Sequence, residues 1–123
     1  MPKLKSFREL IAWQKAMNLV DLVYELTERF PRREHFGLAH QLRKSAVSIP
    51  SNIAEGTRHR TPGYVHHLVI ALGSHAELDT QCEIATRRDY IRPADRSKLQ
   101  SDIDEVGRIV HGLARSLDPT GDF

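Results

Sequence analysis

The chain has 123 residues, of which 40% are hydrophobic, 28% charged and 7% aromatic; this composition fits one globular domain and excludes collagen-like and strongly disordered chains. The single cysteine, Cys82, excludes an internal disulfide and a cysteine-rich zinc site, so we expect a reducing, cytoplasmic location. No apolar run approaches the roughly 18 residues of a membrane span. The basic start lacks the apolar segment of a secretory signal, so we expect neither an anchor nor export.

The net charge of +2 is unevenly distributed along the chain. Residues 1–60 hold eleven Lys and Arg against six Asp and Glu, a balance of +5, whereas residues 61–123 hold seven against ten, a balance of −3. This asymmetry is typical either of a basic half that binds an anionic partner or of two halves that attract each other.

Apolar residues recur at helical spacing and predict four helices, over about residues 7–29, 35–55, 62–88 and 93–117. Ser6 followed by Glu9 is a capping box for the first helix, and Gly56 closes the second. Thr61-Pro62 opens the third, with Thr61 as N-cap. Because the connections are short, we expect a single all-α domain over residues 1–123, an antiparallel up-down-up-down four-helix bundle.

Pro50 lies inside the second predicted helix. Proline removes one backbone donor and crowds the preceding turn, so we expect a kink there. The apolar face from Leu38 through Ile49 to Ile53 continues across the proline, which favours one kinked helix. The alternative is two shorter helices, the second capped by Ser48.

The first helix is apolar over an arc of about 200°, which is wider than one bundle core covers in a domain of this size. One stripe of this arc is Trp13, Met17, Val20 and Tyr24. We predict that the other stripe forms an interface between copies of the chain: Ala16, Leu19, Val23, Leu26 and Phe30. The alternative is that loops or the tail cover this face.

Polar residues form a stripe on each of the two central helices. The second helix carries Gln41, Ser45, Ser48, Asn52 and Glu55 at spacings of three and four, and the third carries His67, Ser74, Glu77 and Gln81. We expect the two stripes to face each other and form a structural hydrogen-bonded network. A groove or the inside of an oligomeric ring is the alternative.

Catalytic and metal-binding patterns are weak in this sequence. Neither Glu-x-x-His nor His-Glu-x-x-His occurs among the seven histidines, so we expect no metal, and His75 fits a hydrogen-bonded core histidine. Cys82 lies on an apolar stripe, where cysteine acts as a small hydrophobe. No Gly-rich loop follows a strand, so we expect no nucleotide cofactor.

One enzymatic pattern is present. Arg60 precedes His66 and His67 at the spacing seen in some small helical ribonucleases, in which arginine holds the phosphate and histidine transfers the proton. Arg29–His35 and Arg33–His40 have the same spacing, so the pattern is not specific.

The run over residues 41–56, QLRKSAVSIPSNIAEG, closely resembles the signature of the four-helix-bundle proteins encoded in 23S ribosomal RNA intervening sequences. WQKA at residues 13–16, FGL at 36–38 and GSHAEL at 73–78 resemble further motifs of that family. Together they cover most of the chain from Trp13 to about Ile91. Residues from Pro93 onward match only in hydrophobic pattern.

The resemblance implies a compact antiparallel bundle and, from related proteins, a ring of five subunits. The family is similar to the accessory variability proteins of diversity-generating retroelements, whose basic barrel is linked to nucleic-acid binding. No enzymatic activity is established for the family, so no catalytic residues carry over. Its motif residues in this chain are Gln41, Arg43, Ser48, Asn52, Glu55, Ser74 and Glu77.

We therefore expect a non-enzymatic homo-oligomer that binds RNA or a ribonucleoprotein partner. The expected phosphate contacts come from basic residues of the first two helices and their ends: Arg32, Arg33, Arg43, Lys44, Arg58 and Arg60. A ribonuclease that uses Arg60 with His66 or His67, and a protein–protein scaffold without nucleic acid, are the alternatives.

Overall fold

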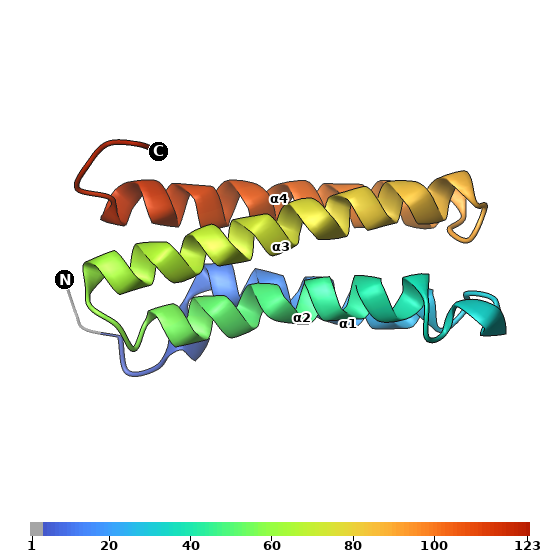
Figure 1. The fold of residues 1–123 in the computed structure, drawn as a ribbon, viewed down its shortest axis with the longest axis horizontal. Helices are drawn as coiled ribbons and strands as arrows, with labels where there is room; N and C mark the ends of the chain where they lie inside the picture. Colours follow the sequence, from blue (N-terminus) through green and yellow to red (C-terminus); the bar gives the residue numbers. More distant parts are fainter. Residues whose placement is uncertain (1–3) are drawn as a thin grey trace.

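A computed structural model describes residues 4–123 of the chain. Its elements in chain order are the 3-10 turn η1 (Phe7–Glu9), α1 (Ile11–Thr27), the 3-10 turn η2 (Arg32–Glu34), α2 (Leu38–Gly56), α3 (Thr61–Arg87) and α4 (Pro93–Leu117). Figure 1 shows the four α-helices side by side, each running opposite to the one before it. The predicted all-α four-helix architecture is confirmed. No helix in the described range is long and apolar enough to cross a membrane.

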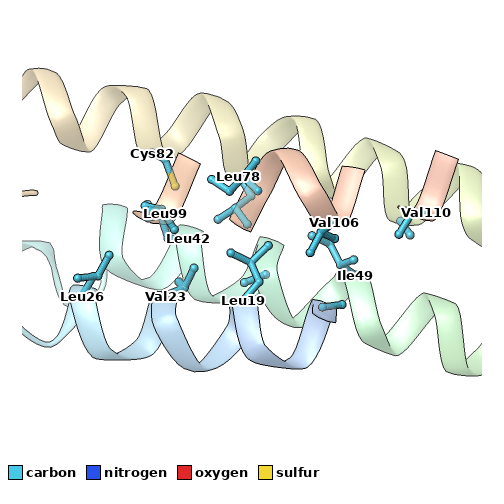
Figure 2. Close-up of a cluster of buried hydrophobic side chains, with 14 of the residues drawn as sticks. Leu19, Val23, Leu26, Leu42, Ile49, Leu78, Cys82, Leu99, Val106 and Val110 are labelled. Carbon is cyan, nitrogen blue, oxygen red and sulfur yellow. The ribbon is translucent and has the colours of Figure 1, made fainter. Parts of the chain in front are cut away.

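Each helix packs against two others. α1 and α3 both contact α2 and α4, so the core lies along the axis that all four helices surround (Figure 2). Fully buried side chains from every helix fill it, including Leu19, Val23, Leu42, Ile49, Ile53, Leu68, Leu78, Leu99, Ile103, Val106 and Val110. Burial of these apolar side chains is the main term that stabilises the bundle.

Ser6 caps η1 instead of the long helix, and the reciprocal bonds of the predicted capping box between Ser6 and Glu9 do not form. The Ser6 hydroxyl accepts from the backbone N–H of Arg8 at 3.2 Å, and the Glu9 carboxylate accepts from the backbone N–H of Lys5 at 3.1 Å. The backbone then becomes extended at Leu10, which serves as the N-cap of α1. The sequence pattern therefore identified a real helical start, but that helix is a single turn.

The other predicted boundaries lie close to the observed ones. α1 ends at Thr27, two residues before the expected position, and α2 begins at Leu38 instead of residue 35. Arg60, and not Thr61, is the N-cap of α3. The fourth helix has its predicted bounds. The residues after α4 fold back on it, since Arg115 Nε donates to the carbonyl oxygen of Phe123 at 3.0 Å.

α2 runs through Pro50 as one helix, so the alternative of two shorter helices is wrong. Pro50 is buried, and the apolar face that spans it stays in the core through Ile49 and Ile53. One turn before this point, the carbonyl oxygen of Val47 accepts a hydrogen bond of 2.8 Å from the hydroxyl of Ser51, the residue after the proline.

The interface predicted on the first helix requires a correction. Its five residues, Ala16, Leu19, Val23, Leu26 and Phe30, are between 1% and 5% exposed in the single chain. Figure 2 shows Leu19, Val23 and Leu26 in the core. This stripe faces the bundle because α1 packs between α2 and α4. The neighbouring stripe, which includes Met17 and Tyr24, is the one left partly open to solvent.

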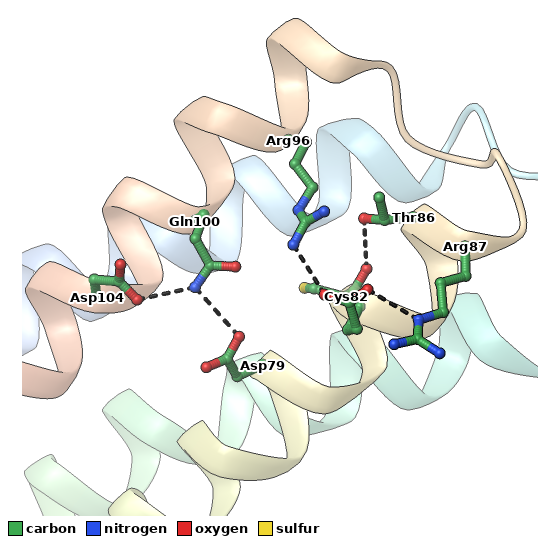
Figure 3. A network of polar contacts seen from close by, with 8 residues as sticks. Asp79, Cys82, Thr86, Arg87, Arg96, Gln100 and Asp104 are labelled. Carbon is green, nitrogen blue, oxygen red and sulfur yellow. Dashed lines mark hydrogen bonds and ion pairs between the residues drawn. The ribbon is translucent and has the colours of Figure 1, made fainter.

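Polar contacts join α3 to α4 along their exposed edge (Figure 3). Arg96 pairs with Glu83 at 2.9 Å, and Gln100 donates to Asp79 at 3.3 Å. Deeper in the seam, His75 Nε2 lies 2.7 Å from the carbonyl oxygen of Ile103. His75 therefore makes the hydrogen bond that the sequence predicts, but it is half-buried at the α3–α4 contact and is not in the core.

Candidate nucleic-acid interface and the polar network between α2 and α3

The predicted basic residues do not form one cluster. Arg32 and Arg33 lie in η2, before α2 begins, whereas Arg58 and Arg60 lie in the connection that follows α2. A helix of 19 residues separates the two groups, which places them about 28 Å apart along the bundle axis. The two groups therefore occupy opposite ends of the molecule (Figure 1).

Arg43 is half-buried and engaged between α1 and α2. Its Nε donates to the hydroxyl of Thr27 at 2.8 Å, and its guanidinium lies over the ring of Tyr24, 4.9 Å from the ring centroid. Thr27 is fully buried and donates in turn to the carbonyl oxygen of Val23 at 2.7 Å. These contacts give Arg43 a role in holding α2 against α1. Lys44, its neighbour, is exposed.

Four arginines share the end of the bundle that holds η2, and we call this group the arginine end: Arg32, Arg33, Arg88 and Arg92. The hydroxyl of Tyr90 donates to the Glu34 carboxylate at 3.0 Å, which fastens η2 to the connection between α3 and α4. All four side chains are exposed. Among residues 4–123, none of the four forms an ion pair within 4.0 Å.

Glu34 and Asp89 are acidic groups at the arginine end, and Glu34 is the one that joins its two segments. The backbone N–H of Leu38 and the hydroxyl of Tyr90 hold its pKa below the usual value, with a smaller contribution from the charge of Arg33. The Glu34 carboxylate is thus occupied by two hydrogen-bond donors. It therefore fixes the local backbone without neutralising the arginines by direct pairing.

The sequence alone does not indicate Arg88 and Arg92 as partners of Arg32 and Arg33. More than fifty residues separate the two pairs in the sequence, so only the chain's return through α3 brings them together. The adjacent arginines at positions 87 and 88 were the available signal, but Arg87 itself pairs with Glu83 at 3.1 Å.

The opposite end of the bundle is hollowed. A cavity of about 550 Å³ is lined by basic and aromatic side chains, among them Arg8, Arg58, Phe7 and Tyr64. The guanidinium of Arg8 stacks on Phe7 at 4.7 Å, so one face of that ring is already covered. Burial raises the pKa of the Tyr64 hydroxyl. Arg58 therefore shares this cavity with the aromatic rings of Phe7 and Tyr64.

The two polar stripes of α2 and α3 meet in one hydrogen-bonded chain. Ser74 and Ser48 share a hydrogen bond of 2.7 Å between their hydroxyls. Asn52 Nδ2 donates to the carbonyl oxygen of Ser48 at 2.9 Å, and Asn52 Oδ1 lies 3.1 Å from His67 Nδ1. His67 Nε2 lies 3.8 Å from a carboxylate oxygen of Glu55. This series of polar contacts thus runs from the middle of the contact between α2 and α3 to the end where α2 leads into α3.

A polar groove of about 350 Å³ continues this seam toward the arginine end. Gln41, Lys44, Glu77 and Gln81 line it beside the serines. Gln41 and Glu77 are exposed, and among residues 4–123 their side chains make no hydrogen bond. Gln81 Oε1 is buried and has no partner in the same range. The family-motif residues Gln41 and Glu77 therefore border the network without joining it.

The residues of the ribonuclease alternative have different environments. Arg60 is the exposed N-cap of α3, and His66 is exposed on its second turn. His67 is partly buried, and its Nδ1 is engaged by Asn52. Only His66 of the two histidines is therefore free of a side-chain hydrogen bond within residues 4–123.

A solved structure and a protein family match this chain. The chain is similar to a solved structure from Bacteroides thetaiotaomicron, a protein with unknown function from the S23 ribosomal protein family. The two share 20% sequence identity with a TM-score of 0.79, over 85% of this chain and 96% of that one, which shows a common fold. No curated protein sequence matches significantly. The model of the 23S rRNA-intervening sequence protein family matches residues 8–112, and the chain belongs to this family.

Proposed function

We propose that this protein is a non-enzymatic RNA-binding bundle that acts in the cytoplasm and contacts the phosphate backbone through its arginine end. The observation that carries the proposal is the convergence of four exposed arginines from two distant segments, tied together by Tyr90 and Glu34. The name of the family, which refers to an intervening sequence in 23S rRNA, supports RNA as the partner.

The chemistry of the arginine end fits phosphate groups. A guanidinium offers two parallel N–H donors to two oxygens of one phosphate and keeps its charge at any physiological pH. Contacts of this kind bind without reading base sequence. Phe36 is the exposed aromatic side chain beside η2. Stacking of one RNA base on its ring would add to the affinity of the phosphate contacts. A structured or single-stranded RNA of mixed sequence is the expected ligand.

Charge reversal at the arginine end is expected to weaken RNA binding. Four phosphate contacts to a single-stranded RNA predict a log–log salt slope of about −3, and Arg32→Glu with Arg33→Glu should reduce its magnitude by about 1.4. Fluorescence anisotropy with a labelled RNA at several salt concentrations measures both the affinity and the slope.

Arg58→Glu with Arg60→Glu is the matched control, because it changes the net charge equally at the opposite end. We expect this variant to bind with a slope close to that of the wild type. Equal losses in both variants would contradict the arginine end and indicate general charge attraction. A flat salt response in the wild type would favour the scaffold alternative, and RNA cleavage that His66→Ala abolishes would favour the ribonuclease.

We also propose that copies of the chain associate through the partly open stripe of α1. A groove of about 370 Å³ lies between α1 and α2, and its lining is mostly apolar: Phe7, Arg8, Trp13, Met17, Val20, Val47, Pro50, Ser51 and Ala54. A second copy is the expected occupant, since exposed apolar grooves mark interaction sites and the family resemblance implies a ring of five subunits.

A charged residue in this groove is expected to dissociate the oligomer. Val47, 39% exposed, borders it, and Val47→Asp would place an unpaired carboxylate in the interface. Light scattering should then report a single 14.0 kDa chain. Val69, on α3 and 47% exposed, is the matched valine outside the groove, and Val69→Asp should leave the oligomer intact. A wild-type protein that is monomeric at high concentration contradicts this proposal.

A further inference from the structure

Three side chains with metal-ligand chemistry converge at the end of the bundle opposite the arginine end. Glu55 comes from the last turn of α2, His59 from the connection that follows, and His67 from the second turn of α3. One ligand atom of each lies within 4.8 Å of those of the other two. The two imidazole rings stack, with 4.9 Å between their centroids. We call these residues the His–His–Glu cluster.

The hydrogen bonds of Asn52 define the tautomer of His67. Asn52 Nδ2 donates to the carbonyl oxygen of Ser48 at 2.9 Å, which identifies the amide nitrogen and leaves Oδ1 facing His67. Because Oδ1 can only accept, the hydrogen between it and His67 Nδ1, 3.1 Å away, belongs to the histidine. In the neutral ring the lone pair then lies on Nε2. Metal-binding histidines are held in this way, with the second ring nitrogen donating to an oxygen.

The lone pair of His67 Nε2 faces an acceptor. The nearest carboxylate oxygen of Glu55 is 3.8 Å away, so a cation between these two acceptors would be bound by both. A metal ion lies in the plane of the imidazole that binds it, so the exposed ring of His59, which stacks on His67, has to turn before both rings and the Glu55 carboxylate can share one divalent ion.

Two glycines bring the backbone close to the imidazoles. A Cβ atom on Gly63 would lie 2.7 Å from Cβ of His59, and one on Gly56 would lie 3.2 Å from Cβ of His67. Any side chain at Gly63 would therefore push His59 away from the cluster. The α2–α3 turn is tight enough to hold both rings because neither position carries a side chain.

We propose that Glu55, His59 and His67 bind one divalent transition-metal ion of the zinc type, with a fourth coordination position open to water. Imidazole nitrogen with one carboxylate oxygen suits zinc and its neighbours, whereas magnesium and calcium prefer oxygen ligands. Ligand atoms around a tetrahedral zinc ion lie about 3.4 Å apart, so the cluster closes by roughly 1 Å on loading. Glu55 and His59 are exposed and free to make this movement. His67, with 14% of its side chain exposed, stays in place.

Helical spacing in the sequence does not reveal the His–His–Glu cluster, because its three residues do not lie on one helix. Glu55 and His59 are four residues apart, but α2 ends at Gly56, so the pair lies across the end of a helix. His67 then joins from the next helix. This site is independent of the arginine end, which lies at the other end of α2.

Isothermal titration of zinc chloride into the untagged, metal-free full chain tests the proposal. We expect one ion per chain, and His59→Ala or Glu55→Gln should each weaken zinc binding at least about tenfold. His66 is the matched control, because its ring lies 5.6 Å from that of His67 but outside the cluster. His66→Ala should bind zinc as the wild type does. Should His59→Ala lose helical circular dichroism, His59→Gln replaces it.

The ring nitrogens report the assigned coordination directly. In nitrogen-15 spectra, zinc should shift Nε2 of His67 while the proton on Nδ1 stays in place. Asn52→Ala, which removes the positioning residue, should weaken zinc binding by about 10- to 100-fold. The proposal is overturned by the absence of saturable binding, by zinc binding in His59→Ala that equals the wild type, or by equal losses in His59→Ala and His66→Ala.

Discussion

Leu19→Ala is expected to lower the free energy of unfolding by about 3 to 5 kcal/mol. Leu19 is 1% exposed and lies in the centre of the core, where α1 meets its two neighbours (Figure 2). Truncation removes buried methyl groups and leaves a cavity that close-packed neighbours cannot fill. Urea denaturation followed by circular dichroism measures the loss, which should not depend on protein concentration.

Met17→Ala is the matched substitution on the other stripe of α1. Met17 lines the open groove, so its truncation should cost less than about 1 kcal/mol in dilute solution, where copies are separate. The cost should grow with protein concentration if a second copy covers the groove, because association stabilises the folded chain. A larger loss from Met17→Ala than from Leu19→Ala in the monomer would contradict the orientation of α1.

Native Cys82 is expected to react with thiol reagents about 1000-fold more slowly than an ordinary cysteine below pH 9, before any steric protection is counted. Burial, and then the charge of Asp79, raise the pKa of the thiol from 9.0 to about 12, against a smaller opposing effect of Arg96. Figure 3 shows Cys82 on α3 beside these groups. The rate of alkylation by iodoacetamide, measured from pH 7 to pH 9 with and without urea, checks this expectation.

The raised pKa also has a consequence for stability. The folded chain keeps the Cys82 proton to higher pH than the unfolded chain, so this contribution is complete below about pH 9 and is lost as the pH rises toward 12. Cys82→Ala removes the thiol and should flatten this part of the stability curve. Alkylation of the native wild type at the rate of an exposed thiol would contradict the burial.

The helical period of the sequence predicted the four helices well. α4 has its predicted bounds, and its single apolar stripe, from Leu99 to Val110, leaves one orientation toward the core. The orientation of α1 was harder to predict, since its two apolar stripes both satisfy the helical period. The pattern could not decide which stripe faces the bundle, and the structure buries Leu19 while leaving Met17 at the groove.

The candidate sites divide in the same way. Residues on one helix face, such as Ser48 and Asn52, follow from helical spacing, and the structure joins them in one network. Arg88 and His59 were missed as members of clusters, because their neighbours come from other segments of the chain. A spacing rule describes one helix at a time and contains no information on where a turn brings the chain back.

The sequence by itself determined the number of helices, their approximate ends and the family, because periodicity, caps and motifs are local properties of the chain. Only the tertiary structure decided which stripe of α1 is core, which arginines share an end, and that Glu55, His59 and His67 meet. The physical reason is that these outcomes depend on how each helix is rotated about its axis and where its neighbours end. Packing of all four helices around one core sets both together.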